Sequence, residues 1–157
     1  MEAATVSEAT AGGGTGSKTI ADLLPLSAKV YGERPAIRWK DESGRWVSHS
    51  FTEVGEIVEK LALGLIDLGI EKGDKVSILA NTRPEWTYAD FAALSVGATV
   101  VPIYQTNSAE ECGYVLENSD AKVVVVEDQA QLDKVRAVRA GLPALEHVVL
   151  MIGEADD

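Results

Sequence analysis

The chain has 157 residues, a formal net charge of −11, 46% hydrophobic residues and 25% charged residues. That length fits one domain, and the apolar fraction is enough to bury a core. The acidic balance argues against a surface that follows nucleic acid or anionic lipid, and the single cysteine, Cys112, excludes an internal disulfide. Because no stretch approaches the ~20 apolar residues of a membrane-spanning helix, we expect a soluble, cytoplasmic protein without a transmembrane segment.

The first third of the chain predicts a tail, a helix and a hairpin. Residues 1–18 are rich in small residues, and we expect them to be disordered. Apolar positions from Ile20 to Val30 predict a short helix that is interrupted near Pro25. Residues 35–40 and 46–51 alternate on either side of a polar, glycine-containing turn, which predicts a β-hairpin.

The rest of the chain predicts alternating helices and strands. From Val54 to Leu68 apolar residues recur every three or four positions, so this segment forms an amphipathic helix. Ser50 and Glu53 make a capping-box pattern at its start, and Gly69 suits its end. Strands are then expected at 75–80, 99–104, 122–127 and 147–152, and helices at 84–96, 109–117 and 129–140.

This order of elements indicates the fold class. Strands that are apolar without alternation are buried on both faces, and alternation with helices makes the sheet mostly parallel. We therefore predict an α/β fold with a doubly wound, mostly parallel sheet and an N-terminal β-hairpin. Pro102 has no N–H to donate, so the strand at 99–104 needs an edge or irregular position.

Two patterns suggest chemistry but are better explained by structure. Gly12 to Thr19 is similar to a phosphate-binding P-loop, but Ser17 stands where that motif needs glycine, and no buried strand precedes it. His49, His147 and Cys112 lie in a hairpin, a strand and a helix, and nothing in their spacing predicts a nucleophile–base set.

Two pairs of adjacent acids, Glu110-Glu111 and Glu127-Asp128, also have a structural explanation. Adjacent residues on a helix diverge by about 100° and seldom converge on one atom. Glu110 and Glu111 suit the first turn of a helix, where the helix dipole favours acids. We therefore assign no catalytic residue and no metal ligand.

The segment from Val101 to Ser108 is the candidate binding site. A strand ends there, and polar side chains lead into a helix. Open parallel sheets bind ligands beyond the carboxyl ends of their strands, and residues 104–107, with Asn107 the last, are in such a place. Tyr104, Gln105 and Thr106 are the candidate site residues. The alternative is that Asn107 or Ser108 simply caps the following helix.

Several short strings add a resemblance. In the middle of the chain they are Gly73-Asp-Lys-Val-Ser-Ile-Leu-Ala-Asn81, Pro84-Glu-Trp86 and Gly97-Ala-Thr-Val-Val-Pro-Ile-Tyr104, with Thr106. Around them stand Arg34-Pro-Ala-Ile37, Ser50-Phe-Thr-Glu53, Leu68-Gly-Ile70 and Ser119-Asp-Ala-Lys122. Taken in chain order, over residues 19 to 152, these strings resemble adenylate-forming (AMP-binding) enzymes, and most of all long-chain fatty acid–CoA ligases.

The resemblance implies a reaction and its partners. A fatty acid attacks the α-phosphate of ATP to give an acyl-adenylate, and the thiol of CoA then displaces AMP. Mg²⁺ and a lysine balance the phosphate charge in such a reaction. The family's phosphate loop, its adenine and ribose motifs and its catalytic lysine have no counterpart in this sequence, because they lie downstream of the matching region.

Residues 19–157 are therefore expected to be the incomplete N-terminal part of an AMP-binding domain, inactive alone and completed by the remainder of the same polypeptide. Residues Tyr104 to Thr106 are expected near the CoA and acyl-adenylate side of its cleft. Two alternatives stay open: a parent that activates aryl or amino acids, and a self-contained α/β binding module. A peripheral contact with membranes is also left open.

Overall fold

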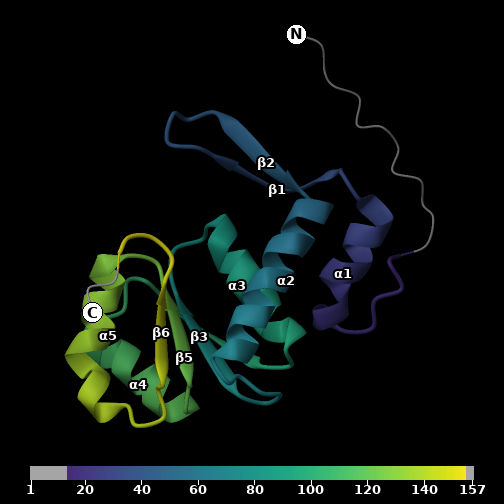
Figure 1. Ribbon diagram of the computed structural model, residues 1–157. Helices are drawn as coiled ribbons and strands as arrows, with labels where there is room; N and C mark the ends of the chain where they lie inside the picture. The colour runs from purple at the N-terminus through teal and green to yellow at the C-terminus, as the bar shows by residue number, and fades with distance from the viewer. Residues whose placement is uncertain (1–13, 155–157) are drawn as a thin grey trace.

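The computed structural model describes residues 14–154 (Figure 1). Most of the predicted tail, including Gly12 and Gly13 of the P-loop-like string, lies outside the described residues. At its C-terminal end, the Ser17 hydroxyl donates a hydrogen bond to the Asp22 carboxylate at 2.6 Å. The Lys18 N–H donates to the same carboxylate at 3.2 Å, so residues 17 and 18 belong to the cap of the first helix.

That helix, α1 (Ile20–Tyr31), is continuous, and the predicted interruption near Pro25 is wrong. It starts with a capping box between Thr19 and Asp22. The carbonyl that loses its helical donor at Pro25 belongs to Ala21, which is partly exposed, so water can hydrate it instead. Leu24, beside it, is buried and belongs to the core cluster formed with α2, which holds the helix together through the proline.

The hairpin has the predicted position. Strands β1 (Pro35–Lys40) and β2 (Trp46–Ser50) pair in antiparallel fashion. Phe51 was expected in the second strand but is the first residue of α2 (Phe51–Asp67). The capping box between Ser50 and Glu53 explains the difference, because it begins the helix directly at the end of the strand.

The main sheet confirms the predicted fold class. Its four parallel strands run in the order β4-β3-β5-β6. The strands are β3 (Lys75–Leu79), β4 (Thr99–Ile103), β5 (Val123–Val126) and β6 (His147–Leu150). The helices between them are α3 (Pro84–Ser95), α4 (Ala109–Ser119) and α5 (Gln129–Val138), the last followed by a 3₁₀ turn, Arg139–Gly141. Pro102 lies on β4, an edge strand of the described sheet, as predicted.

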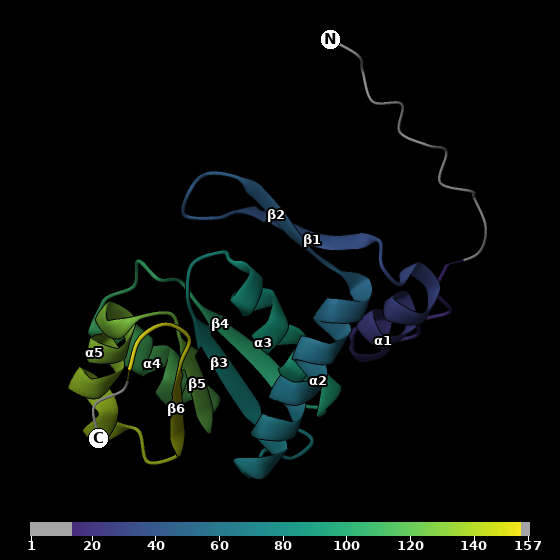
Figure 2. The same cartoon turned by 45° about the horizontal axis from the view of Figure 1, so that its top comes forward.

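Helices cover both faces of this sheet (Figures 1 and 2). Val76, Ile78, Val123 and Val125 pack in one core cluster with α2 and α3. Leu79, Val124 and Val126 pack in a second cluster with α4 and α5. Both faces of β5 are therefore buried, which is why its four residues are all valine with no polar alternation.

The strand order creates a switch point. The chain runs from β3 through α3 to β4, and then returns past β3 through α4 to β5. The segments that follow β3 and β5 therefore leave the sheet toward opposite faces. Ligand sites of open α/β sheets form at such a place, outside the carboxyl ends of the strands.

Candidate functional site

A cavity of about 560 Å³ lies at the carboxyl ends of β3 and β4. Its lining consists of Ala80, Asn81, Thr82, Trp86, Pro102, Ile103, Tyr104 and Gln105. Two of the three predicted site residues, Tyr104 and Gln105, are thus brought together with the loop that follows β3. Tyr104 is 78% exposed, so its ring is open to a ligand. Thr106 is exposed and stands outside this lining.

The backbone that carries these residues is held from three directions. The Asn107 N–H donates to the Tyr104 carbonyl at 3.0 Å, which closes a turn. Ser108, not Asn107, caps α4, and it forms a capping box with Glu111. From α5, the Lys134 ammonium donates to the Gln105 carbonyl at 2.6 Å. The structural role proposed for this segment as a helix cap is therefore confirmed, and it leaves the side chains of Tyr104 and Gln105 available.

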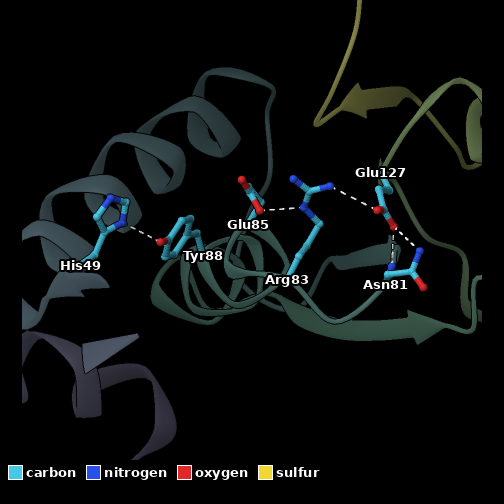
Figure 3. A network of polar contacts seen from close by, with 6 residues as sticks. All are labelled: His49, Asn81, Arg83, Glu85, Tyr88 and Glu127. Atoms are coloured by element: carbon cyan, nitrogen blue, oxygen red, sulfur yellow. Dashed lines mark hydrogen bonds and ion pairs between the residues drawn. The ribbon is translucent and has the colours of Figure 1, made fainter. Parts of the chain in front are cut away.

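The Glu127 carboxylate joins the loop after β3 to the segment after β5, at the switch point of the sheet (Figure 3). Glu127, directly after β5, accepts hydrogen bonds from the backbone N–H and the side-chain amide of Asn81, at 2.6 and 2.8 Å. Its other oxygen accepts from the Arg83 guanidinium at 3.2 Å. The Glu127 side chain is only 13% exposed, so these contacts are poorly screened by water. The loop after β3 is thereby tied to the end of β5.

Arg83 is shared between two carboxylates. Its Nε donates to Glu85 at 2.7 Å while the other end of the guanidinium contacts Glu127. The hydrogen bond with Glu85 raises the pKa of Arg83 and lowers the pKa of Glu85, and the attraction of opposite charges acts in the same direction. The charge of Arg83 is therefore already balanced, and the residue orders the loop.

A second polar pair anchors the hairpin to α3. Nδ1 of His49 and the hydroxyl of Tyr88 are 2.7 Å apart (Figure 3). Burial, assisted by the charges of Glu85 and Glu53, raises the pKa of Tyr88 to about 12, so its phenol stays neutral at physiological pH.

Cys112 lies elsewhere, on the buried side of α4 in the core cluster shared with α5, and burial raises the pKa of its thiol. His49 instead contacts Tyr88 in the cluster on the other face of the sheet, and His147 lies on β6. The structure thus places these three residues on separate elements, a hairpin strand, a helix and a strand of the main sheet.

The contacts of Asn81, Arg83 and Glu127 were missed by sequence reasoning. Glu127 was considered only together with Asp128, whose side chain instead caps α5 by accepting from the Gln131 N–H at 3.0 Å. The signal was present, because Asn81 and Glu127 each follow the end of a buried strand. Within residues 14–154, no three His, Cys, Asp or Glu side chains gather in a way that could hold a metal ion. No helix in that range is long and apolar enough to cross a membrane.

Comparison of the sequence with known proteins shows which family the chain belongs to. The chain is 39% identical over 139 residues to the long-chain-fatty-acid–CoA ligase heimdall of Drosophila melanogaster. The matched region is 87% of this chain and 20% of the relative. The chain is 41% identical over 110 residues to the long-chain-fatty-acid–CoA ligase FadD15 of Mycobacterium bovis, over 70% of this chain and 18% of the relative. The chain thus spans about a fifth of the length of these relatives.

Solved structures agree with the fold. The anthranilate CoA ligase AuaEII, in complex with anthranoyl-AMP, superposes with a TM-score of 0.78 at 27% identity, over 88% of this chain and 25% of that one. The long-chain-fatty-acid–CoA ligase FadD1 of Archaeoglobus fulgidus superposes with a TM-score of 0.77 at 27% identity, over 87% of this chain and 28% of that one. A family model, described as AMP-binding enzyme, matches residues 24–157. With this match over most of its length, the chain belongs to the AMP-binding enzyme family.

Proposed function

We propose that this chain is the N-terminal part of a long-chain fatty acid–CoA ligase. The observation that carries the proposal is the 39% identity to a curated ligase of this kind over 87% of the chain. The whole enzyme converts a fatty acid, ATP and CoA into acyl-CoA, AMP and diphosphate. The fatty acid carboxylate attacks the α-phosphate and releases diphosphate, and the CoA thiol then displaces AMP.

In this proposal the cavity after β3 and β4 lies on the CoA and acyl-adenylate side of the cleft. Trp86 and Tyr104 provide aromatic faces for a flat ring, and the amides of Asn81 and Gln105 provide hydrogen-bonding groups. Thr106, one residue further along, adds a hydroxyl at the exposed end. These residues bind and orient, and none of them forms or breaks a covalent bond.

The phosphate chemistry is assigned to the part of the enzyme beyond this chain. Mg²⁺ neutralises phosphate charge when ATP is bound. Residues 14–154 contain no group of three or more His, Cys, Asp or Glu side chains that could hold a metal ion. On the resemblance to the family, we place the phosphate loop, the catalytic lysine and the Mg²⁺ site in the portion that the relatives carry outside the matched region.

An apolar groove supports the proposal that further polypeptide packs on this chain. The groove encloses about 510 Å³ between α2, α3 and the last strands of the sheet, and its apolar lining includes Ile57, Leu61, Leu65, Val149 and Met151. It adjoins β6, which pairs with β5 alone among the described strands. The sheet can grow at this edge, and added polypeptide would cover the groove.

We further propose that the enzyme works in the cytoplasm and touches membranes only peripherally. A net charge of −11 disfavours nucleic acid as a partner. Fatty acid, CoA and the remainder of the polypeptide are the proposed partners.

Fatty-acid-dependent exchange between ATP and radiolabelled diphosphate tests the ligase proposal. The complete gene product is expected to catalyse exchange with long-chain fatty acids, and the 157-residue chain is expected to catalyse none. Absence of exchange by the complete product across a full panel of fatty acids would refute it. A reading frame that ends at Asp157 would favour the self-contained binding module.

A second candidate is activation of an aryl acid. It is favoured by the match to the anthranilate CoA ligase, whose TM-score of 0.78 is similar to the 0.77 of the long-chain ligase structure. The same exchange assay separates the candidates when benzoate-type and amino acids join the panel. Exchange with those acids alone would favour the second candidate.

A further inference from the structure

The β-hairpin carries a positive surface on an otherwise acidic protein. Residues 34–50 contain four basic and two acidic residues, whereas the rest of the chain has ten basic and 23 acidic residues. Asp41 pairs with Arg45 at 3.2 Å across the turn, which neutralises that arginine. Within residues 14–154, Arg38 and Lys40 have no ion-pair partner, and both are exposed. In the same range Arg34 and Glu42 also have no ion-pair partner, so the segment keeps three unpaired cations against one unpaired acid.

Two of these cations, Arg38 and Lys40, share one face with an exposed tryptophan. Lys40 pairs with Trp46 in the hairpin register, and Arg38 lies two residues before Lys40 on the same side. The Trp46 ring is contacted by both cations, with the Arg38 guanidinium carbon 5.8 Å and the Lys40 nitrogen 5.5 Å from its centre. Trp46 is 62% exposed, which is unusual for so large an apolar side chain.

The opposite face of the hairpin is the one attached to the body. Trp39 and His49 lie there, with ring centres 4.9 Å apart, and His49 contacts Tyr88 of α3. Figures 1 and 2 show the turn end of the hairpin extending away from the helices. By strand alternation, Arg38, Lys40 and Trp46 lie on the other face of the hairpin. Arg38 and Lys40 also line a hollow of about 390 Å³ beside Thr82 to Glu85 at the start of α3, and Trp46 stands outside that lining.

We propose that this face (Arg38, Lys40 and Trp46) contacts the headgroup region of an anionic phospholipid bilayer. Indole rings prefer the boundary between headgroups and acyl chains, and unpaired basic residues are attracted to anionic headgroups. The projecting position separates these cations from the acidic body, whose repulsion is screened within about 8 Å at physiological salt. The contact gives a location to the peripheral membrane attachment proposed above.

Vesicle co-sedimentation tests the contact. The 157-residue chain is expected to bind phosphatidylcholine vesicles that contain phosphatidylglycerol, to bind pure phosphatidylcholine much less, and to be released by salt. Arg38→Gln with Lys40→Gln should weaken binding about 30-fold, because each cation near the surface is worth about five-fold. Lys29→Gln with Lys60→Gln is the matched control. It makes the same change in net charge at exposed helical lysines and should bind like the wild type.

Quenching by brominated phosphatidylcholine adds a local readout. Membrane-dependent quenching should disappear in Trp46→Phe and persist in Trp39→Phe, provided circular dichroism shows both variants folded. No vesicle binding, or equal loss in the lysine control, would overturn the proposal. A change in Trp46 emission with inorganic phosphate alone would also overturn it, in favour of a small-anion site. Because no ATP, CoA or fatty acid is present, failure here leaves the proposed ligase activity untouched.

Discussion

The ion pair between Arg83 and Glu127 should be a measurable source of stability. In Glu127→Gln, the amide oxygen can still accept from Asn81, but the new NH₂ group faces the guanidinium, which is itself a donor. Exposed pairs contribute about 0–1 kcal/mol, and breaking a buried pair costs about 3–5 kcal/mol. The side chains of Arg83 and Glu127 are 24% and 13% exposed, so this pair lies between those limits.

We therefore expect Glu127→Gln to lower the free energy of unfolding by about 2 kcal/mol. For a domain of this size, that corresponds to a fall in Tm of about 4–8 °C. Thermal unfolding followed by circular dichroism is the assay, and Glu42→Gln, an exposed residue of the hairpin turn, is the matched control. A double-mutant cycle with Arg83→Gln isolates the pair. A melting curve of Glu127→Gln that coincides with wild type would refute the assigned role.

Three further predictions concern the side chains of Tyr88, Asp74 and Cys112. Tyr88→Phe removes the hydrogen bond to His49, so it should cost about 1 kcal/mol and speed hydrogen exchange in β2, with unchanged exchange in β5 as the internal control. The pKa of Asp74 is lowered by hydrogen bonds from the Glu71 N–H and from Lys122. Such a carboxylate stabilises the fold above its ordinary pKa and loses that effect as the pH falls through its lowered value. In Asp74→Asn, Tm should therefore fall less steeply than in the wild type as the pH is lowered into the acid range. The same fall of Tm with pH in both proteins would contradict this. The Cys112 thiol should react with a thiol reagent only after denaturant is added, and rapid labelling of the folded chain would contradict its burial.

Local patterns were sufficient for most of the secondary structure. Capping side chains at Ser50 and Ser108 and the left-handed Gly69 mark helix ends through hydrogen bonds between near neighbours in the sequence. The valine run of β5 indicated a strand buried on both faces. Pro25 misled the prediction because the cost of a proline in a helix depends on which carbonyl loses its partner and on the packing of the residues beside it.

Sequence patterns predicted only part of the candidate site. The position of Tyr104 and Gln105 after a strand was enough to predict that they lie at the carboxyl edge of the sheet. Their neighbours across the cavity, Asn81 and Trp86, depend on β3 being adjacent to β4. Strand order is set by crossovers and by long-range packing, and it has no local signature in the sequence.

The amino-acid sequence by itself determined the elements of this protein, its α/β class and its resemblance to fatty acid–CoA ligases, because these depend on periodicity, capping and short motifs. Only the tertiary structure decided that Glu127 would meet Asn81 and Arg83, more than forty residues away in the chain. It also decided that the hairpin face with Trp39 and His49 would pack toward α3, which leaves Arg38, Lys40 and Trp46 on the other face. Composition averages charge over the whole molecule, whereas a binding surface depends on which few side chains the fold brings together.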